Sequence, residues 1–369
     1  MKTTHRIFFG NAADMHDVQS NSVDLMVTSP PYPMITMWDE IFSKQNPAIG
    51  DALKKDDGKV AFELMHRELD KVWVEIYRVL RQGGFACINV GDATRTIGGD
   101  FKLYPNHARI LSHCLELEFS PLPEILWRKQ TNAPNKFMGA GMLPAGAYVT
   151  LEHEFILILR KGGKRLFNAP EEKQLRRESA YFYEERNLWF SDVWQDLQGT
   201  RQNGLPKHIR ERSGAYPFEL PFRLISMFSV KGDTVLDPFL GTGTTALAAM
   251  ATRRNSIGIE IDPNFKEHLS QRFSSVLDIA EQRLKSRIVN HLQFIEERER
   301  TKGKPLYENK HYGFPVVTNQ ETEIIFCELN WMEEISDSVF EAGYRENSVT
   351  SWEKPMGIDL ARLGVVSIA

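Results

Sequence analysis

The chain is poor in cysteine, which occurs only three times in 369 residues. Cys87, Cys114 and Cys327 lie far apart and form no Cys-x-x-Cys pair, which argues against a zinc site or a disulfide framework and suits a reducing compartment. Long apolar runs are absent too: no stretch approaches the ~20 residues of a membrane span, and residues 1–5 lack the apolar core of a signal peptide. We therefore predict a cytoplasmic protein with no metal site and no membrane contact.

The sequence also lacks a large excess of charge of either sign. Its net charge is −4, from 45 basic and 49 acidic residues. The chain as a whole is no polycation, so any nucleic-acid binding must depend on local basic patches. No Gly-x-x-x-x-Gly-Lys-Ser/Thr sequence is present, which argues against a P-loop. The length favours one large domain plus an appendage.

Strand-like and helix-like segments alternate from Val23 to about Ile261, the pattern of an α/β sheet. Helical spacing of apolar residues predicts helices over 62–80 and 103–117, and one long helix from 264 to about 298. Residues 45–59 are polar and predict a mobile loop, whereas 132–146 predict an irregular loop over a site. We expect strands over residues 23–28, 85–90, 124–127, 155–159, 234–236 and 256–261.

The most informative segment is Thr28-Ser29-Pro30-Pro31-Tyr32, which follows the first apolar strand. Neither proline can donate a hydrogen bond, so the backbone there offers carbonyl acceptors beside a serine hydroxyl and an aromatic ring. Acceptors at the rim of an aromatic plane suit a planar molecule with an amino group, such as cytosine or adenine. On its own the segment could equally be a strand that ends in a proline turn.

A second motif, Asp237-Pro238-Phe239-Leu240-Gly241-Thr242-Gly243-Thr244-Thr245, combines a strand end, a glycine turn and a helix start. The glycines permit close approach of a ligand, and the helix start offers free N–H groups. About 20 residues later a strand ends in Glu260-Ile261-Asp262, where a carboxylate can accept from both ribose hydroxyls of a nucleoside. Because the Asp237 carboxylate would repel a pyrophosphate and attract a cation, the motif favours S-adenosyl-L-methionine over NAD.

The two motifs, in this order and with an acidic strand end after them, resemble those of the amino-methylating DNA methyltransferases. The similarity spans roughly Phe9 to Asp262, and its order resembles the β group, whose chain is circularly permuted. Matching segments between the motifs include residues 88–92 and 152–155. Two departures stand out, since Asn11 replaces the usual acid near the adenine and Arg212 replaces a frequent His before the Phe-Pro segment.

The resemblance implies a Rossmann-like class I methyltransferase sheet, circularly permuted. It implies a catalytic half over 1–160, a target-recognition region over 161–207, a cofactor half over 208–300 and a C-terminal extension over 301–369. Catalytic roles fall on Ser29, Pro30, Pro31 and Tyr32. S-adenosyl-L-methionine binding falls on Asn11, Thr28, Tyr216, Pro217, Asp237, Pro238, Phe239, Gly241, Gly243, Thr244, Thr245, Glu260 and Asp262.

Family members with Ser at the first position of the proline motif mostly methylate cytosine N4, whereas adenine enzymes usually have Asp or Asn. Ser29 therefore favours cytosine, with adenine N6 as the alternative. Methylation at cytosine C5 is disfavoured, because none of the three cysteines follows a proline as the nucleophile of that family does. An RNA or small-molecule amine methyltransferase, and a nucleotide-binding module or NAD-dependent enzyme, stay open as rival functions.

Basic residues alternate with aromatic ones after Lys161, at the place where the family has its target-recognition region. Such a surface suits the phosphates of the double-stranded DNA from which a base must be flipped. We expect a restriction–modification enzyme that acts as a monomer or homodimer, with a cognate endonuclease as a possible partner. The DNA contacts that this predicts are Lys161, Lys164, Arg165, Arg176, Arg177, Arg201, Lys207 and Arg210.

Overall fold

In the computed structural model, residues 1–129, 138–199 and 216–346 are described, and they form an α/β fold around one ten-stranded sheet. The order across the sheet is β10-β6-β9-β3-β2-β11-β12-β1-β16-β15. Five neighbouring strands, β3, β2, β11, β12 and β1, run parallel. In the same order across the sheet, the strands span Val193–Trp194, Phe119–Arg128, His153–Lys161, Leu80–Val90, Val23–Thr28, Thr234–Asp237, Asn255–Glu260, Lys2–Phe9, Val339–Glu346 and Cys327–Ser336.

Strand β2 lies in the middle of the sheet and is buried along its whole length. Leu25 and Val27 pack against a cluster on one face, whereas Met26 packs against the cluster on the other face. Side chains alternate between the two faces of a strand, so a strand covered on both sides is apolar throughout. This explains why its bounds, 23–28, could be predicted from the sequence without error.

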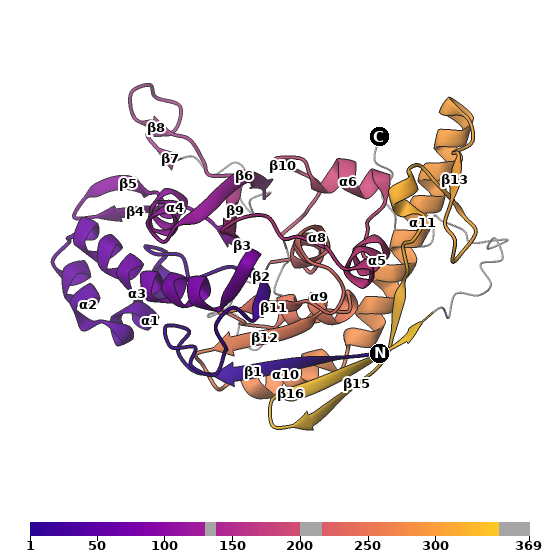
Figure 1. Ribbon diagram of the computed structural model, residues 1–369. Helices are drawn as coiled ribbons and strands as arrows, with labels where there is room; N and C mark the ends of the chain where they lie inside the picture. Colours follow the sequence, from indigo (N-terminus) through magenta and orange to yellow (C-terminus); the bar gives the residue numbers. More distant parts are fainter. Residues whose placement is uncertain (130–137, 200–215, 347–369) are drawn as a thin grey trace.

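Helices cover both faces of the sheet, in two groups (Figure 1). One face is covered chiefly by α1 (Asp39–Gln45), α2 (Pro47–Lys54), α3 (Gly58–Val79) and α4 (Asn106–Glu116). The other is covered by α8 (Glu219–Phe228), α9 (Thr244–Ala251), α10 (Phe265–Phe273) and α11 (Val276–Lys302). Short helices α5 (Pro170–Glu178) and α6 (Tyr183–Trp189) follow β9, and further two-stranded pairs are β4–β5 (Ala93–Ile97, Asp100–Tyr104), β7–β8 (Met138–Gly139, Ala147–Tyr148) and β13–β14 (Tyr307–Glu308, Pro315–Val316).

Two of the expected elements differ in the structure. The single long helix expected from 264 is broken at Ser274 and Ser275 into α10 and α11, although the apolar stripe runs on through Phe273 and Val276, both fully buried. The loop expected over 45–59 is mostly helical, because Asn46 caps α2 by accepting from the Ala48 N–H and Pro47 occupies its first turn.

The C-terminal extension, unassigned from the sequence, is partly a hairpin that joins the main sheet. Strand β16 pairs antiparallel with β1, from Lys2 opposite Gly343 to Arg6 opposite Val339, and β15 pairs with β16. The hairpin lies at the lower edge of the sheet in Figure 1. Within the described parts of the chain, no helix combines the length and the apolar character that crossing a bilayer requires.

Candidate active site

A cavity of about 630 Å³ opens at the carboxyl ends of the parallel strands, where an open α/β sheet binds its ligands. Both sequence motifs line it, although Tyr32 and Phe239 are separated by more than half of the chain. They meet because β2 and β11 are neighbours, with Leu25 opposite Val235 and Met26 opposite Leu236. The predicted residues that line it are Asn11, Ser29, Pro30, Pro31, Tyr32, Tyr216, Asp237, Pro238, Phe239, Gly241, Thr244, Glu260 and Asp262.

The hydroxyl groups of the proline motif form a directed chain of hydrogen bonds. Tyr32 Oη donates to Glu154 Oε2 at 3.0 Å and lies 3.0 Å from Ser29 Oγ. Burial and the neighbouring Glu154 carboxylate raise the pKa of Tyr32 well above its ordinary value, so the phenol keeps its proton. Because that one proton goes to Glu154, Ser29 must be the donor to Tyr32. The lone pairs of Ser29 are therefore left free as acceptors.

Three residues around this chain have functional positions that we did not predict. Glu154 lies at the start of β9 and accepts from Lys129 Nζ at 2.9 Å and from Asn89 Nδ2 at 2.7 Å. Glu154 and Lys129 line the cavity, whereas Asn89 is buried behind Tyr32. The matching segments 88–92 and 152–155 contained a signal for two of them, but the residue pattern alone gave those segments no role.

Asp237 joins the two motifs through its buried carboxylate. It accepts from Thr28 Oγ1 and Thr245 Oγ1, each at 2.6 Å, and from the Phe239 N–H at 3.1 Å. Tyr216 also donates to it, at 3.3 Å. Thr28 and Thr245, predicted as cofactor-binding residues, are buried and do not line the cavity, and their hydroxyl groups orient Asp237.

The glycine turn is shaped by a residue outside the cavity lining, Gly243, which precedes helix α9 with φ of 78°. A Cβ there would lie 2.7 Å from Leu269 and 2.8 Å from Phe273. Only glycine tolerates both this backbone conformation and this close packing. Pro217, also outside the lining, accepts from the Leu220 N–H at the start of α8.

Glu260 is a buried carboxylate held by two backbone donors. Its oxygens accept from the Gly241 N–H at 2.8 Å and the Asp262 N–H at 2.9 Å. Burial raises the pKa of Glu260 to about 7 in spite of these hydrogen bonds. Asn11 Oδ1 accepts from the Ala13 N–H at 2.9 Å and keeps a second lone pair for a ligand amine. Carboxylate, amide and aromatic groups in one cavity fit S-adenosyl-L-methionine, which is cationic and has a ribose and an adenine.

We expect the affinity for S-adenosyl-L-methionine to fall as the pH drops from about 8 to about 6. A carboxylate that accepts from hydroxyl groups beside a cation must be ionised, so the bound state lowers the pKa of Glu260 below the value of about 7 in the free protein. Below that pH, binding must first release a proton, and the affinity loss approaches tenfold per pH unit. Calorimetric titrations at several pH values measure it. The Glu260→Gln variant should have a flat profile over this range, and an unchanged slope in that variant would contradict the assignment.

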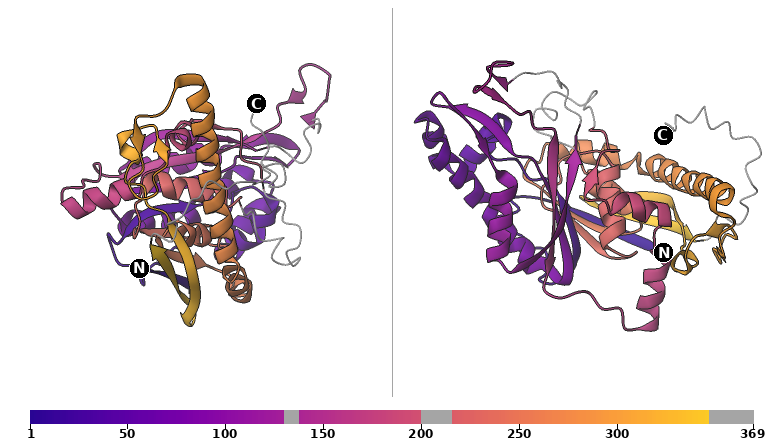
Figure 2. Two further views of the ribbon diagram at one scale, coloured as in Figure 1. Left: turned by 90° about the vertical axis from the view of Figure 1, so that its right-hand side faces the viewer. Right: turned by 90° about the horizontal axis from the view of Figure 1, so that it is seen from above.

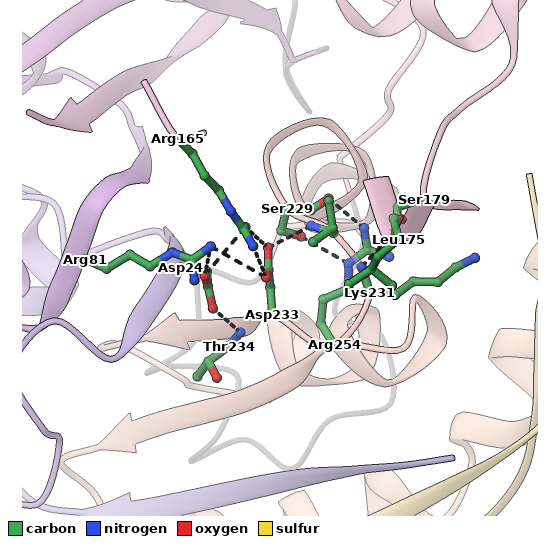
Figure 3. A network of polar contacts seen from close by, with 12 residues as sticks. Asp24, Arg81, Arg165, Leu175, Ser179, Ser229, Lys231, Asp233, Thr234 and Arg254 are labelled. Atoms are coloured by element: carbon green, nitrogen blue, oxygen red, sulfur yellow. Dashed lines mark hydrogen bonds and ion pairs between the residues drawn. The ribbon is translucent and has the colours of Figure 1, made fainter. Parts of the chain in front are cut away.

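The predicted DNA contacts lie elsewhere. The prediction that Lys161 contacts DNA is wrong. Its ammonium donates to Asn21 Oδ1, Tyr77 O and Leu80 O, which leaves no proton for a phosphate. Arg165 donates to Asp233 at 2.6 Å, in a network with Asp24 and Arg81 (Figure 3). Lys164, Arg176 and Arg177 are exposed and line a different cavity, and Arg201, Lys207 and Arg210 lie outside the described residues.

This second region lies at the amino ends of the parallel strands, the edge opposite the site. Asp24 begins β2 and the adjoining Asp233 precedes β11, whereas Ser29 and Asp237 come at the other ends of these strands. In the right-hand view of Figure 2, α5 lies at the bottom and the β7–β8 hairpin at the top. The expected target-recognition surface is therefore not beside the candidate active site over Lys161–Glu178.

Two cavity residues flank the insertion between β6 and β9: Lys129 begins it, and Glu154 lies in β9 just after it. Its described part forms the β7–β8 hairpin, whose turn exposes 86% of Met142 and 69% of Leu143. Tyr148 of β8 stacks on Phe101 of β5 with ring centroids 4.7 Å apart, which ties the hairpin to the β4–β5 pair.

Comparison with known proteins places these features in a family. Residues 23–272 match a family model described as DNA methylase. The type II methyltransferase M.MthZI from Methanothermobacter thermautotrophicus is 52% identical over 347 residues, which are 94% of this chain and 96% of that protein. The type II methyltransferase M.MjaI from Methanocaldococcus jannaschii is 50% identical over 281 residues, or 73% of this chain and 91% of that protein.

Solved structures agree with these matches. TTHA0409 from Thermus thermophilus, determined in complex with S-adenosyl-L-methionine, is 32% identical, with a TM-score of 0.57 and coverage of 74% of this chain and 94% of that one. The PvuII DNA methyltransferase, described as cytosine-N4-specific, has a TM-score of 0.53 over 76% of this chain and 93% of that one, at 16% identity, and so supports the fold alone. The predicted α/β fold and the predicted S-adenosyl-L-methionine cofactor are confirmed.

Proposed function

The chain belongs to the DNA methylase family and is an S-adenosyl-L-methionine-dependent DNA methyltransferase, and we propose that its target is the exocyclic N4 amine of a cytosine flipped out of duplex DNA. Since its relatives M.MthZI and M.MjaI are type II methyltransferases, we assign it to a restriction–modification system. We keep the expected domain bounds at residues 160, 207 and 300 as part of this proposal. We assign the DNA interface, however, to the β7–β8 hairpin and not to the basic segment after Lys161.

The observation on which the proposal rests is the hydrogen-bonded chain from Ser29 through Tyr32 to Glu154. Ser29 donates to Tyr32, and Tyr32 donates to Glu154, so the Ser29 oxygen faces the cavity as an acceptor. The exocyclic amine of cytosine is a weak nucleophile because its lone pair is delocalised into the ring. If Ser29 Oγ and the Pro30 carbonyl each accept one amine hydrogen, the nitrogen becomes pyramidal and its lone pair is freed.

The rest of the cavity would position the base and the methyl donor. S-adenosyl-L-methionine, when bound, supplies a methyl group on a sulfonium. Tyr32 would stack on the flipped base, an aromatic contact worth ~1–3 kcal/mol that offsets part of the flipping cost. Gly91 leaves room for this ring, since a Cβ at Gly91 would lie 3.0 Å from Tyr32 Cε2. Fixed acceptors and orientation, with no covalent intermediate, account for the acceleration.

Glu154 fixes the acceptor direction in this scheme. Its carboxylate accepts from Tyr32, Asn89 and Lys129, and its partners hold it in place. A neutral amide there would break the order of the chain, since its NH₂ group can donate to Tyr32 and so reverse the Ser29 hydroxyl. Glu154 is therefore a positioning residue that acts through Tyr32.

The choice of cytosine rests on Ser29 standing where adenine-specific enzymes usually have Asp or Asn. We expect purified protein to form N4-methylcytosine in duplex DNA, identified by mass spectrometry of the digested nucleosides. N6-methyladenine as the only product would overturn the base assignment and leave the family intact. Sequencing the modified DNA then gives the recognition site, and parallel reactions on RNA and on free nucleosides test the rival substrates.

The DNA interface follows from the position of the insertion. We assign the β7–β8 hairpin to the DNA-facing side, because the cavity residues Lys129 and Glu154 flank the insertion. Lys129 is half-exposed at this rim, with its ammonium 5.3 Å from the centroid of the Trp127 ring. If Lys129 and other basic groups at this rim contact DNA phosphates, the methylation activity should decrease steeply as the salt concentration rises.

A further inference from the structure

A second cavity of the described structure has a larger volume than the catalytic one. A groove of about 1240 Å³ lies at the amino ends of the parallel strands, between the segment that contains α5 and the residues around η2 (Asn319–Glu321). It shares no lining residue with the catalytic cavity. Its volume exceeds the roughly 300–1,000 Å³ of a small-molecule pocket, which favours an extended ligand.

The groove is strongly cationic, although the chain as a whole has a net charge of −4. The acidic side chains of its lining are already neutralised or capped: Asp24 pairs with Arg81, Glu323 pairs with Lys310, and Glu321 accepts from the Tyr183 N–H. Basic side chains from one segment contribute most of the remaining charge, namely Lys164, Lys173, Arg176, Arg177 and Arg186.

Several of these basic groups have no acidic partner. Lys164, Lys173 and Arg177 are exposed and form no ion pair within the described residues. Arg176 lies 4.9 Å from the centroid of the Phe167 ring, and Arg165 lies 4.6 Å from the same ring. Unpaired cations gathered on one wall repel one another, and a bound anion would relieve this repulsion.

The wall that presents these groups is fixed to the core. The Lys231 N–H donates to Ser179 Oγ at 3.0 Å, and Lys231 Nζ donates to the Glu178 carbonyl at 2.6 Å, which holds the C-terminal end of α5 (Figure 3). Arg165 is held by Asp233 at the other end of the segment. The cations of α5 therefore project from a rigid base.

We propose that this groove binds the phosphodiester backbone of a nucleic acid, at a site separate from the catalytic cavity. A row of exposed Lys and Arg side chains suits a repeating phosphate chain better than a single small anion, which needs buried, converging donors. The ring of Phe167 holds two guanidinium groups in place. Contacts to phosphate alone do not depend on the nucleotide sequence. The site would hold a second stretch of nucleic acid while the target base is in the catalytic cavity.

The test compares full-length protein with the Lys173→Gln/Arg176→Gln/Arg177→Gln variant, using a labelled oligonucleotide of arbitrary sequence as a single strand and as a duplex. With at least one of the two oligonucleotides, we expect the wild-type protein to bind two molecules per chain and the groove variant to bind one. The affinity of the groove for the oligonucleotide should be at least tenfold weaker in the variant. Removing three phosphate contacts should also flatten the slope of log K against log salt by roughly 2 for a single strand and roughly 2.7 for a duplex.

A matched variant, Arg300→Gln/Lys302→Gln/Lys304→Gln, removes the same charge from exposed residues at the end of α11 and should bind like wild type. Equal stoichiometry in wild type and groove variant, or equal loss in both variants, would overturn the proposal. So would a groove variant that changes only the oligomeric state in sedimentation, since the groove would then face a second copy. Because binding is measured without methylation, the result does not depend on the base assignment.

Discussion

Replacing Ser29 by alanine should reduce kcat by about 10²–10³-fold while leaving S-adenosyl-L-methionine binding unchanged. The hydroxyl is the acceptor that frees the amine lone pair, and Tyr32 does not replace it, because Tyr32 Oη already accepts from Ser29 and from Asn89 Nδ2. Single-turnover methylation on saturating DNA measures the chemical step, and calorimetry measures cofactor affinity. The cost falls in the transition state, so KM for DNA should change little.

The matched control is Ser22→Ala, at a partly exposed serine before the same strand, whose hydroxyl bonds to the Gln19 carbonyl. It should methylate at the wild-type rate. A Ser29→Ala enzyme within threefold of wild type would show that the amine is not oriented by this hydroxyl. The Glu154→Gln variant should lose activity too, and Glu152→Gln, whose carboxylate pairs with exposed Arg128, should not.

The second large effect is expected for Asp237→Ala, on both stability and cofactor binding. The substitution leaves the buried donors of Thr28, Thr245 and the Phe239 N–H without their acceptor, each at a cost of about 1–3 kcal/mol. The carboxylate itself is costly to bury, as its raised pKa indicates, so the net loss should be about 3 kcal/mol. Denaturant unfolding measures this loss.

The Asp237→Asn variant separates the two effects. An amide keeps an acceptor for Thr28 and Phe239 but loses the negative charge, so stability should be largely restored while S-adenosyl-L-methionine affinity stays low. The exposed Asp51→Ala substitution serves as the control for stability. Wild-type cofactor affinity in both Asp237 variants would refute an electrostatic role for this carboxylate.

The sequence predicted the centre of the fold better than its margins. Strand β2 is buried on both faces and its apolar run is uninterrupted, so its bounds were predicted correctly. Strand β1 was missed because polar residues occupy its inward positions: Thr3 and His5 are buried and satisfied by each other and by Ser256, with distances of 2.8 Å. Hydrophobic periodicity cannot detect a strand whose buried positions are hydrogen-bonded polar groups.

The residues of the candidate site also differ in how well the sequence predicted them. The two motifs are continuous in sequence and each has a recognisable turn, so the residues that they contribute to the cavity were named in advance. The wall over residues 35–45, which includes Ile35, Trp38 and Ile41, was not predicted. Glu154 lies in β9 and Lys129 directly follows β6, and their meeting with Tyr32 depends on the pairing of β6 with β9 and of β9 with β3. The basic segment after Lys161 has the composition of a DNA-binding surface, but composition contains no information on the edge of the sheet at which it lies.

The pairing of β1 with β12 and β16 has a consequence for synthesis of the protein in the cell. Strand β1 must wait for partners made more than 250 and 330 residues later, since His5 lies opposite both Ser256 and Phe340. Until β12 and β16 have been made, β1 has both strand edges open, and such edges favour misassembly. Stalled or prematurely terminated chains should therefore aggregate or be degraded, so that a half-made enzyme leaves no half-active product.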